Sequence, residues 1–136
     1  VASETLTIPS TAAKVITVGA YDSRLNAYAD FSGRGGENLS YPKPDLVAPG
    51  VDILAPSVGG SYTGVTGTSF ATPFVTGSAA LMMEWGITRR NDPFLWGEKV
   101  KAYLRRGAAP LPGIREYPDE RVGYGSLCLE SSLPSA

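Results

Sequence analysis

One short stretch of the sequence holds the residues best suited to covalent chemistry. Residues 64–73 read GVTGTSFATP, so Ser69 follows a glycine-containing turn and precedes a long apolar run. This order predicts that Ser69 lies in the first turn of a helix, where unpaired N–H groups and the positive end of the helix dipole stabilise a developing oxyanion. Pro73 also lies near that turn, where a missing N–H costs little. The stretch favours a nucleophilic serine.

A simpler interpretation is that Thr68 or Ser69 only caps the helix, since both residue types are common at N-caps. For an isolated Gly-Thr-Ser triplet, capping is the commoner outcome. A nucleophilic serine also needs a general base, and the sequence contains no histidine. The single cysteine, Cys128, lacks a base for the same reason, and we expect it to be a small buried hydrophobic residue.

Short strands and two helices must position Ser69. Residues 14–20 are rich in β-branched side chains and predict a buried strand. Residues 42–49, which contain Pro42, Pro44 and Pro49, predict an extended path. Shorter strands are predicted at residues 29–31, 51–54 and 61–66.

The first helix is predicted over residues 70–85, and its apolar or small residues on every side predict burial all round. The second helix is predicted to begin at Pro93, with Asp92 as its N-cap, and to end at Gly107. Its apolar face is predicted to comprise Trp96, Val100, Tyr103 and Leu104. Basic residues dominate the stretch 89–106, which we interpret as a solvated helix face, with a site for an anionic partner as the alternative.

Composition narrows the function classes. Hydrophobic residues make up 43% and charged residues 18% of the 136 residues, which is typical of one folded domain. A net charge of −1 argues against binding of nucleic acid. No apolar run has the length of a membrane span, and residues 1–4 do not start a signal peptide. No acidic cluster has metal-ligand spacing, so we expect no metal site, although Asp22 could contribute to one for a cation.

Strands alternating with helices predict an α/β layered fold with a mostly parallel sheet. Two helices and a few short strands are too few to cover both faces of such a sheet. We therefore expect the fold to be incomplete on its own.

Four blocks resemble the subtilisin-like serine proteases (subtilases). Residues 67–73, GTSFATP, resemble the family's nucleophile motif, and the other three blocks follow the family's order along the chain. Those three blocks are VITVGA at 15–20, KPDLVAPGV at 43–51 and VGYGSL at 122–127. Residues 82–100 resemble more narrowly the clostridial subtilases, including those of spore germination.

The resemblance implies that residues 1–136 are the C-terminal segment of a single bacterial peptidase domain with a subtilisin-like three-layer α/β/α fold. Ser69 matches the nucleophile, and its backbone N–H matches one oxyanion donor. Gly67 and Thr68 match the loop that lines the scissile bond. No residue matches the family's catalytic Asp, His or oxyanion Asn, and Asp45 is expected to be structural.

We therefore expect a serine endopeptidase acting on protein or peptide substrates, whose missing residues come from an N-terminal segment of the same protease. The 136-residue chain alone is expected to be inactive. The alternatives are a non-catalytic pseudoprotease that acts as a binding or scaffold protein, and a stand-alone α/β binding module. No cofactor is expected, although calcium could bind the intact protein. The family resemblance points to a secreted, envelope-associated or spore-associated protein.

Overall fold

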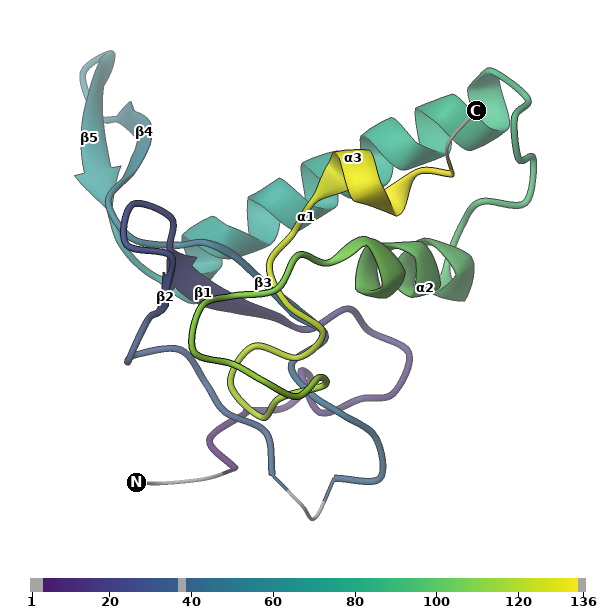
Figure 1. Cartoon of the computed structure of the whole chain (residues 1–136). Helices are drawn as coiled ribbons and strands as arrows, with labels where there is room; N and C mark the ends of the chain where they lie inside the picture. Colours follow the sequence, from purple (N-terminus) through teal and green to yellow (C-terminus); the bar gives the residue numbers. More distant parts are fainter. Residues whose placement is uncertain (1–3, 37–38, 135–136) are drawn as a thin grey trace.

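The computed structural model describes residues 4–36 and 39–134 (Figure 1). A small three-stranded sheet lies at its centre, with strand order β2-β1-β3. β1 (Val18–Asp22) pairs parallel with β3 (Leu46–Pro49) and antiparallel with β2 (Ala27–Tyr28). β4 (Ile53–Ser57) and β5 (Ser61–Val65) form a separate antiparallel hairpin. Figure 1 shows that this hairpin projects from the end of the molecule where α1 begins.

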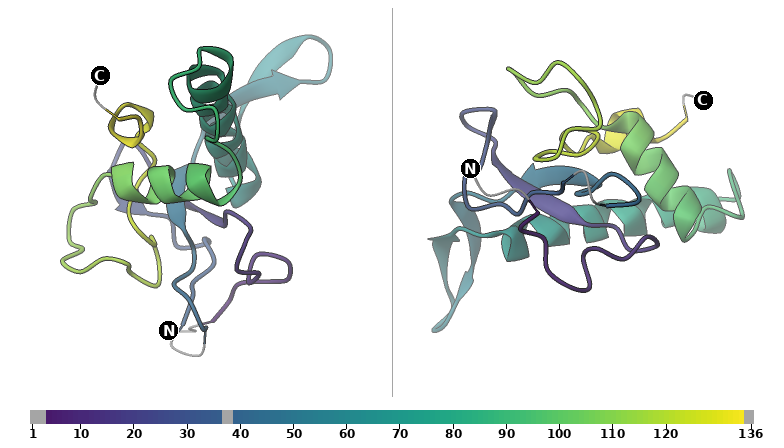
Figure 2. Two further views of the ribbon diagram at one scale, coloured as in Figure 1. Left: turned by 90° about the vertical axis from the view of Figure 1, so that its right-hand side faces the viewer. Right: turned by 90° about the horizontal axis from the view of Figure 1, so that it is seen from below.

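The helices follow the hairpin along the chain. α1 spans Thr68–Met83 and continues into a π-helical turn, η1 (Glu84–Thr88). α2 spans Glu98–Gly107, and the short α3 spans Leu129–Ser132. α2 and α3 lie side by side at the end away from the hairpin (Figure 2).

Alternating residues of β3 divide the core into two clusters. Leu46 and Ala48 pack in the main cluster with side chains from α1 and α2. Val47 points to the other face and packs against Leu111 and Val122 of the C-terminal loops. Among the described residues, helices therefore cover one face of the sheet and loops cover the other, which is a partial α/β layering.

The strand predictions are partly confirmed. β5 matches the predicted strand 61–66, whereas the predicted strands 14–20, 29–31 and 51–54 are each displaced by two or more residues. The extended path predicted for residues 42–49 is confirmed over β3, which the sequence did not predict as a strand and which is the parallel partner of β1. Pro49 ends this strand beside Tyr21, so its missing N–H does not interrupt the ladder.

The prediction that the first helix is buried on every side is wrong for this chain. Its buried residues, Ala71, Val75, Ser78 and Met82, form one stripe at helical spacing. The sheet and α2 cover only this stripe. The remaining sides of α1, including Phe74 and Leu81, are exposed.

The predicted start of the second helix is also wrong. Gly97 adopts φ 56° and ψ −127°, which interrupts the helix and places its first residue at Glu98. Asp92 instead accepts a hydrogen bond from the Phe94 N–H at 3.2 Å within a turn. Trp96 consequently lies outside α2 and is exposed, whereas Val100 and Leu104 are buried as predicted. The predicted end at Gly107 is confirmed.

Candidate active site

Ser69 is the second residue of α1, as predicted from the sequence. Its side chain is exposed, and it makes no hydrogen bond with any described residue. The N-cap is Gly67, and no side chain caps this helix end. The alternative that Thr68 or Ser69 serves only as an N-cap is therefore wrong, and the first N–H groups of α1 are free of side-chain acceptors.

Backbone hydrogen bonds fix the turn before Ser69 to the central sheet. The Gly67 N–H donates to the Gly50 carbonyl at 2.8 Å, and the Gly50 N–H donates to the Tyr21 carbonyl at 3.1 Å. Gly67 adopts φ 155° and ψ 159°, a conformation essentially restricted to glycine. A Cβ at Gly50 would lie 2.6 Å from the Ala20 Cβ, so the backbones meet too closely for any side chain. Ser69 is thereby held near the carboxyl ends of β1 and β3.

The carboxyl end of a parallel sheet is where open α/β folds bind ligands. The first turn of α1 contains no acidic residue, so its N–H groups and dipole present uncompensated positive charge there. An oxygen that becomes negative during attack by Ser69 would be stabilised at this position. Thr68, next to it, is half-buried.

A cavity of about 320 Å³ opens beside Thr68. Its wall comes from the loop before β1, from β1 itself and from the loop after β2. No lining side chain carries a formal charge. The residues that line it are Thr5, Leu6, Thr7, Ser10, Thr17, Val18, Gly19, Phe31, Gly33 and Thr68.

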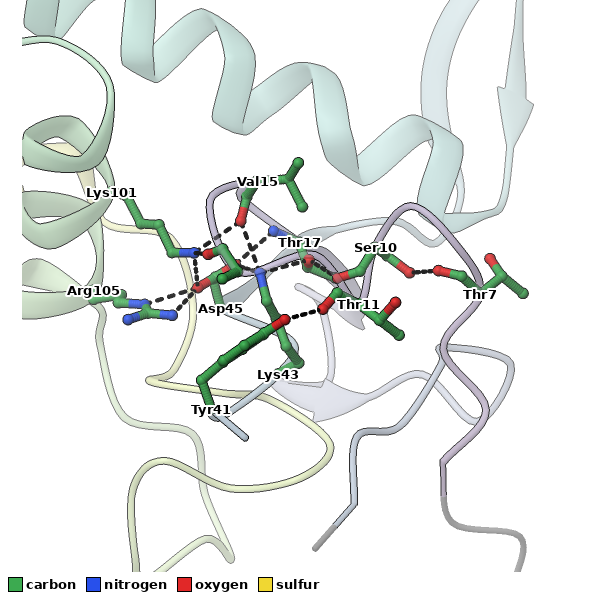
Figure 3. Close-up of polar contacts among 11 residues, drawn as sticks. Thr7, Ser10, Thr11, Val15, Thr17, Tyr41, Lys43, Asp45, Lys101 and Arg105 are labelled. Atoms are coloured by element: carbon green, nitrogen blue, oxygen red, sulfur yellow. Dashed lines mark hydrogen bonds and ion pairs between the residues drawn. The ribbon is translucent and has the colours of Figure 1, made fainter. Parts of the chain in front are cut away.

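Asp45 lies behind this cavity wall in a cluster of ionic side chains (Figure 3). Lys43 Nζ lies 2.8 Å from Asp45 Oδ2, and Lys101 Nζ lies 3.2 Å from Asp45 Oδ1. The Arg105 Nε also donates to Asp45 Oδ1, at 2.8 Å. The Asp45 side chain is completely buried, which supports the predicted structural role. We call Lys43, Asp45, Lys101 and Arg105 the Asp45 cluster.

The Asp45 cluster corrects only part of the prediction that the basic residues of the stretch 89–106 form a solvated face. The other four basic residues are exposed as predicted: Arg89, Arg90, Lys99 and Arg106. Lys101 is buried, and Arg105 is half-buried against Asp45. Their acceptor is a carboxylate of the same chain, so no external anion explains them. One signal in the sequence is their four-residue spacing beside Val100 and Leu104, which places them next to the buried face.

Burial and hydrogen bonding act in opposite directions on the pKa of Asp45. Burial alone raises it, but the hydrogen bond from Lys43, the Thr17 N–H at 2.7 Å and the nearby positive charges together lower the pKa below its ordinary value. Burial lowers the pKa of Lys101, and Asp45 offsets part of that shift. Asp45 is therefore an anion that the cluster holds ionised.

The other predicted residues are placed as follows. Cys128 is half-buried and lies 3.3 Å from the Ser131 hydroxyl, so the expectation of full burial is wrong. Asp22 accepts hydrogen bonds from the Arg24 backbone and guanidinium, and Arg24 also reaches Asp52 at 2.9 Å. Within residues 4–36 and 39–134, no three His, Cys, Asp or Glu side chains converge as metal ligands would. None of the described helices has the length and apolarity needed to cross a bilayer.

Comparisons with known proteins show the family and the fold. Residues 1–125 match the model of the Subtilase family, peptidase S8. Serine protease AprX of Bacillus subtilis is 33% identical over 152 residues, which cover 97% of this chain and 32% of AprX. The structure of the Clostridium perfringens CspB protease matches with a TM-score of 0.91 and 45% identity over 96% of this chain and 28% of that one.

A third relative is the prenylagaramide maturation protease PagA, whose structure matches with a TM-score of 0.78 and 35% identity. That match covers 96% of this chain and 45% of PagA. The chain thus spans about a third of AprX and less than half of either solved protein. The subtilisin-like α/β fold and the resemblance to clostridial relatives are both confirmed. The chain belongs to the subtilase family of serine peptidases.

Proposed function

We propose that this chain is the nucleophile-bearing part of a serine endopeptidase and that Ser69 is its nucleophile. The observation that carries the proposal is the exposed Ser69 side chain in the uncapped first turn of α1, at the carboxyl ends of β1 and β3. Gly67 and Thr68 lead into this turn and would line the scissile bond. The substrate would be a protein or peptide.

In the proposed reaction, Ser69 Oγ attacks the carbonyl carbon of the scissile peptide bond, and a general base takes the hydroxyl proton. The carbonyl oxygen becomes an oxyanion, which the Ser69 backbone N–H would stabilise. The C–N bond then breaks, the amine leaves with the proton, and an acyl-enzyme remains. Water hydrolyses the ester and regenerates the Ser69 hydroxyl.

The general base and its partner must come from elsewhere. The sequence contains no histidine, and Asp45 is buried in its own ionic cluster. We propose that the catalytic Asp and His and the oxyanion Asn belong to an N-terminal segment of the same protease, outside these 136 residues. The exposed side of α1, including Phe74 and Leu81, gives such a segment an apolar surface to cover.

A fluorophosphonate probe tests both parts of the proposal. In the protein encoded by the full gene, hereafter the complete protein, the probe should label Ser69 stoichiometrically. The 136-residue chain alone should not be labelled appreciably. In subtilisin, a known member of this family, loss of the histidine lowers turnover by roughly 10⁶.

The controls separate the alternatives. A folded complete protein that resists the probe would favour the non-catalytic alternative, in which the subtilase fold serves as a binding or scaffold protein. Rapid labelling of the 136-residue chain would show that no external base is needed. No cofactor is expected, and calcium binding by the complete protein is tested separately, because a Tm that falls when calcium is chelated would show that the folded protein binds the ion.

A further inference from the structure

The Asp45 cluster contains more positive charge than its carboxylate can balance. Lys43 and Lys101 are both buried around the single Asp45 carboxylate, and Arg105 approaches it from α2. A buried ammonium is unfavourable unless acceptors surround it. One lysine would suffice to pair Asp45, so the second one needs a further explanation.

Lys101 finds its remaining acceptors on the loop before β1. Its Nζ donates to the Ala13 carbonyl at 2.6 Å and to the Val15 carbonyl at 2.8 Å. Lys43 Nζ shares the Val15 carbonyl at 2.7 Å. The extra charge thus attaches residues 13–15 to α2, although 86 residues of sequence separate Lys101 from Val15.

The same loop continues into the cavity wall. Lys43 Nζ lies 3.0 Å from Thr17 Oγ1, which donates to the Ser10 carbonyl at 2.5 Å. The Ser10 hydroxyl donates in turn to the Thr7 carbonyl. Thr7, Ser10 and Thr17 all line the cavity beside Thr68. Hydrogen bonds from Lys43 therefore lead through Thr17 and Ser10 to Thr7 in the cavity wall, and Lys101 holds residues 13–15, which lie between Ser10 and Thr17 in the chain (Figure 3).

We propose that Lys101 is a positioning residue, which holds this wall through the Ala13 and Val15 carbonyls, and that the wall selects an uncharged substrate side chain next to Ser69. The inference rests on the proposed function, because it treats the cavity as part of the substrate site. The uncharged selectivity follows from the lining, which combines Leu6 and Phe31 with hydroxyl groups and has no charged side chain. A charged group would lose its hydration there without gaining an ionic partner.

Peptide binding in a Ser69→Ala version of the complete protein tests this inference, because it needs no catalytic hydroxyl. Peptides that differ only in one side chain, leucine, phenylalanine, aspartate or lysine, would be compared by their Kd. The leucine or phenylalanine peptide should bind most tightly. Lys101→Met should weaken that binding by about tenfold, since a wall displaced by about 1 Å no longer fits its ligand.

Arg106→Met is the matched control, because Arg106 lies on the same helix and is exposed. Its guanidinium carbon lies 4.6 Å from the centroid of the Tyr103 ring, and it makes no hydrogen bond or ion pair with the loop before β1 among the described residues. This variant should bind as the parent does. Should Lys101→Met not fold, Ser10→Ala breaks the link to Thr7 without removing a charge, and it should weaken binding in the same direction.

In the catalytically competent protein, Lys101→Met should raise KM for the preferred peptide while kcat stays within about twofold. Equal Kd values for Lys101→Met and Arg106→Met would overturn the inference, and so would a preference for charged peptides or no peptide binding. Failure of the proposed function shows separately, as the absence of fluorophosphonate labelling at Ser69.

Discussion

Ser69 and Asp45 differ in what surrounds their oxygen atoms. The Ser69 hydroxyl is exposed and has no hydrogen-bond partner in the described chain. The Asp45 carboxylate is fully buried and is bound by Lys43, Arg105 and the Thr17 backbone, among others. An exposed polar group contributes little to stability, whereas a buried paired charge becomes very unfavourable when its partner is lost. Substitutions at the two sites should therefore affect different properties.

Ser69→Ala should abolish fluorophosphonate labelling and peptide hydrolysis in the complete protein, because it removes the attacking oxygen. The Tm should change by about 1 °C or less, since no hydrogen bond among the described residues is lost. Labelling and a thermal melt of the same preparation measure both effects. Ser23→Ala removes another exposed hydroxyl and should leave labelling intact. Residual labelling of Ser69→Ala would show that another residue is the nucleophile.

Asp45→Asn should destabilise the complete protein by about 3–5 kcal/mol, because it leaves buried ammonium groups without their counter-charge. Urea denaturation measures this change. Asp52→Asn is the matched control, since the Asp52 carboxylate pairs with Arg24 at the exposed surface. The control should show a much smaller loss of stability. Equal losses would contradict a central role for the Asp45 cluster.

The lowered pKa of Asp45 determines how the stability of the fold should change with pH. A carboxyl whose pKa is lower in the folded state stabilises the fold above its unfolded-state pKa, and this contribution is lost as the pH falls through the folded-state pKa. The difference in unfolding free energy between the wild type and Asp45→Asn should therefore shrink as the solution is made more acidic than the ordinary carboxyl pKa. Urea denaturation at a series of pH values measures it, and a constant difference would contradict it.

At the scale of elements, the contact between Gly50 and the start of α1 sets the position of Ser69. Gly50→Ala would place a Cβ 2.6 Å from Ala20 Cβ and 3.1 Å from the Gly67 carbonyl oxygen. Ala20 Cβ is fixed to the β1 backbone and the Gly67 oxygen is itself backbone, so neither can rotate aside, and Gly50 must move relative to β1 and to the turn that begins α1.

Gly50→Ala in the complete protein should cost about 1–3 kcal/mol by overpacking and should slow fluorophosphonate labelling by about tenfold or more. A urea titration and the labelling rate measure these two effects. Gly77→Ala provides a control for the labelling rate, because Gly77 lies in the same helix but outside its first turn. Labelling of Gly50→Ala at the wild-type rate would show that the close contact does not position Ser69.

Elements with a strong local signal were predictable from the sequence. The position of Ser69 at the start of a helix, and strand β5, follow from residues adjacent in the chain. Strand β3 was not predicted because prolines lie close to it on either side. Its pairing with β1 shows that Pro49 is the last residue of the ladder, where its missing N–H interrupts no strand pairing. The start of α2 depends on the backbone of Gly97, which opposes the local signal of Asp92 and Pro93.

The Asp45 cluster could not be predicted for a different reason. Its members come from a loop and from α2, and the Asp45–Arg105 hydrogen bond spans 60 residues of sequence. Lys101 and Arg105 look like ordinary surface residues of an amphipathic helix until the fold places Asp45 beneath them. The same holds for the cavity beside Thr68, whose wall joins the loop before β1 to residues after β2.

At the scale of the whole molecule, the described chain leaves substantial apolar surface uncovered. The exposed large side chains include Phe74 and Leu81 on α1 and Leu54 and Val58 on the hairpin. An exposed apolar face of a few hundred Å² corresponds to several kcal/mol at about 25 cal/mol per Å². This amount is comparable with the stability of a small domain, so these faces should be covered in the complete protein.

Gly77→Ala can decide whether the outer side of α1 is covered. A solvated helix and a covered helix predict changes of opposite sign in the free energy of unfolding. Gly77 lies within the helix, and a Cβ there meets no atom of this chain within 4 Å. On a solvated helix, replacing glycine with alanine stabilises by about 0.5–1 kcal/mol. Against a closely packed neighbour, the extra methyl group should instead destabilise by about 1–3 kcal/mol. We predict destabilisation, measured by urea denaturation of the complete protein.

A pair of larger substitutions controls for helix propensity. Ala80 on α1 and Ala102 on α2 are both exposed in the described chain, and leucine is a good helix former at either position. If other parts of the protein cover α1 but not the polar side of α2, Ala80→Leu should destabilise by about 1–3 kcal/mol and Ala102→Leu should stay within about 0.5 kcal/mol of the wild type. Stabilisation by Gly77→Ala, together with near-neutral changes at both alanines, would mean that α1 faces solvent in the complete protein. The apolar side of α1 would then need an explanation other than an N-terminal segment.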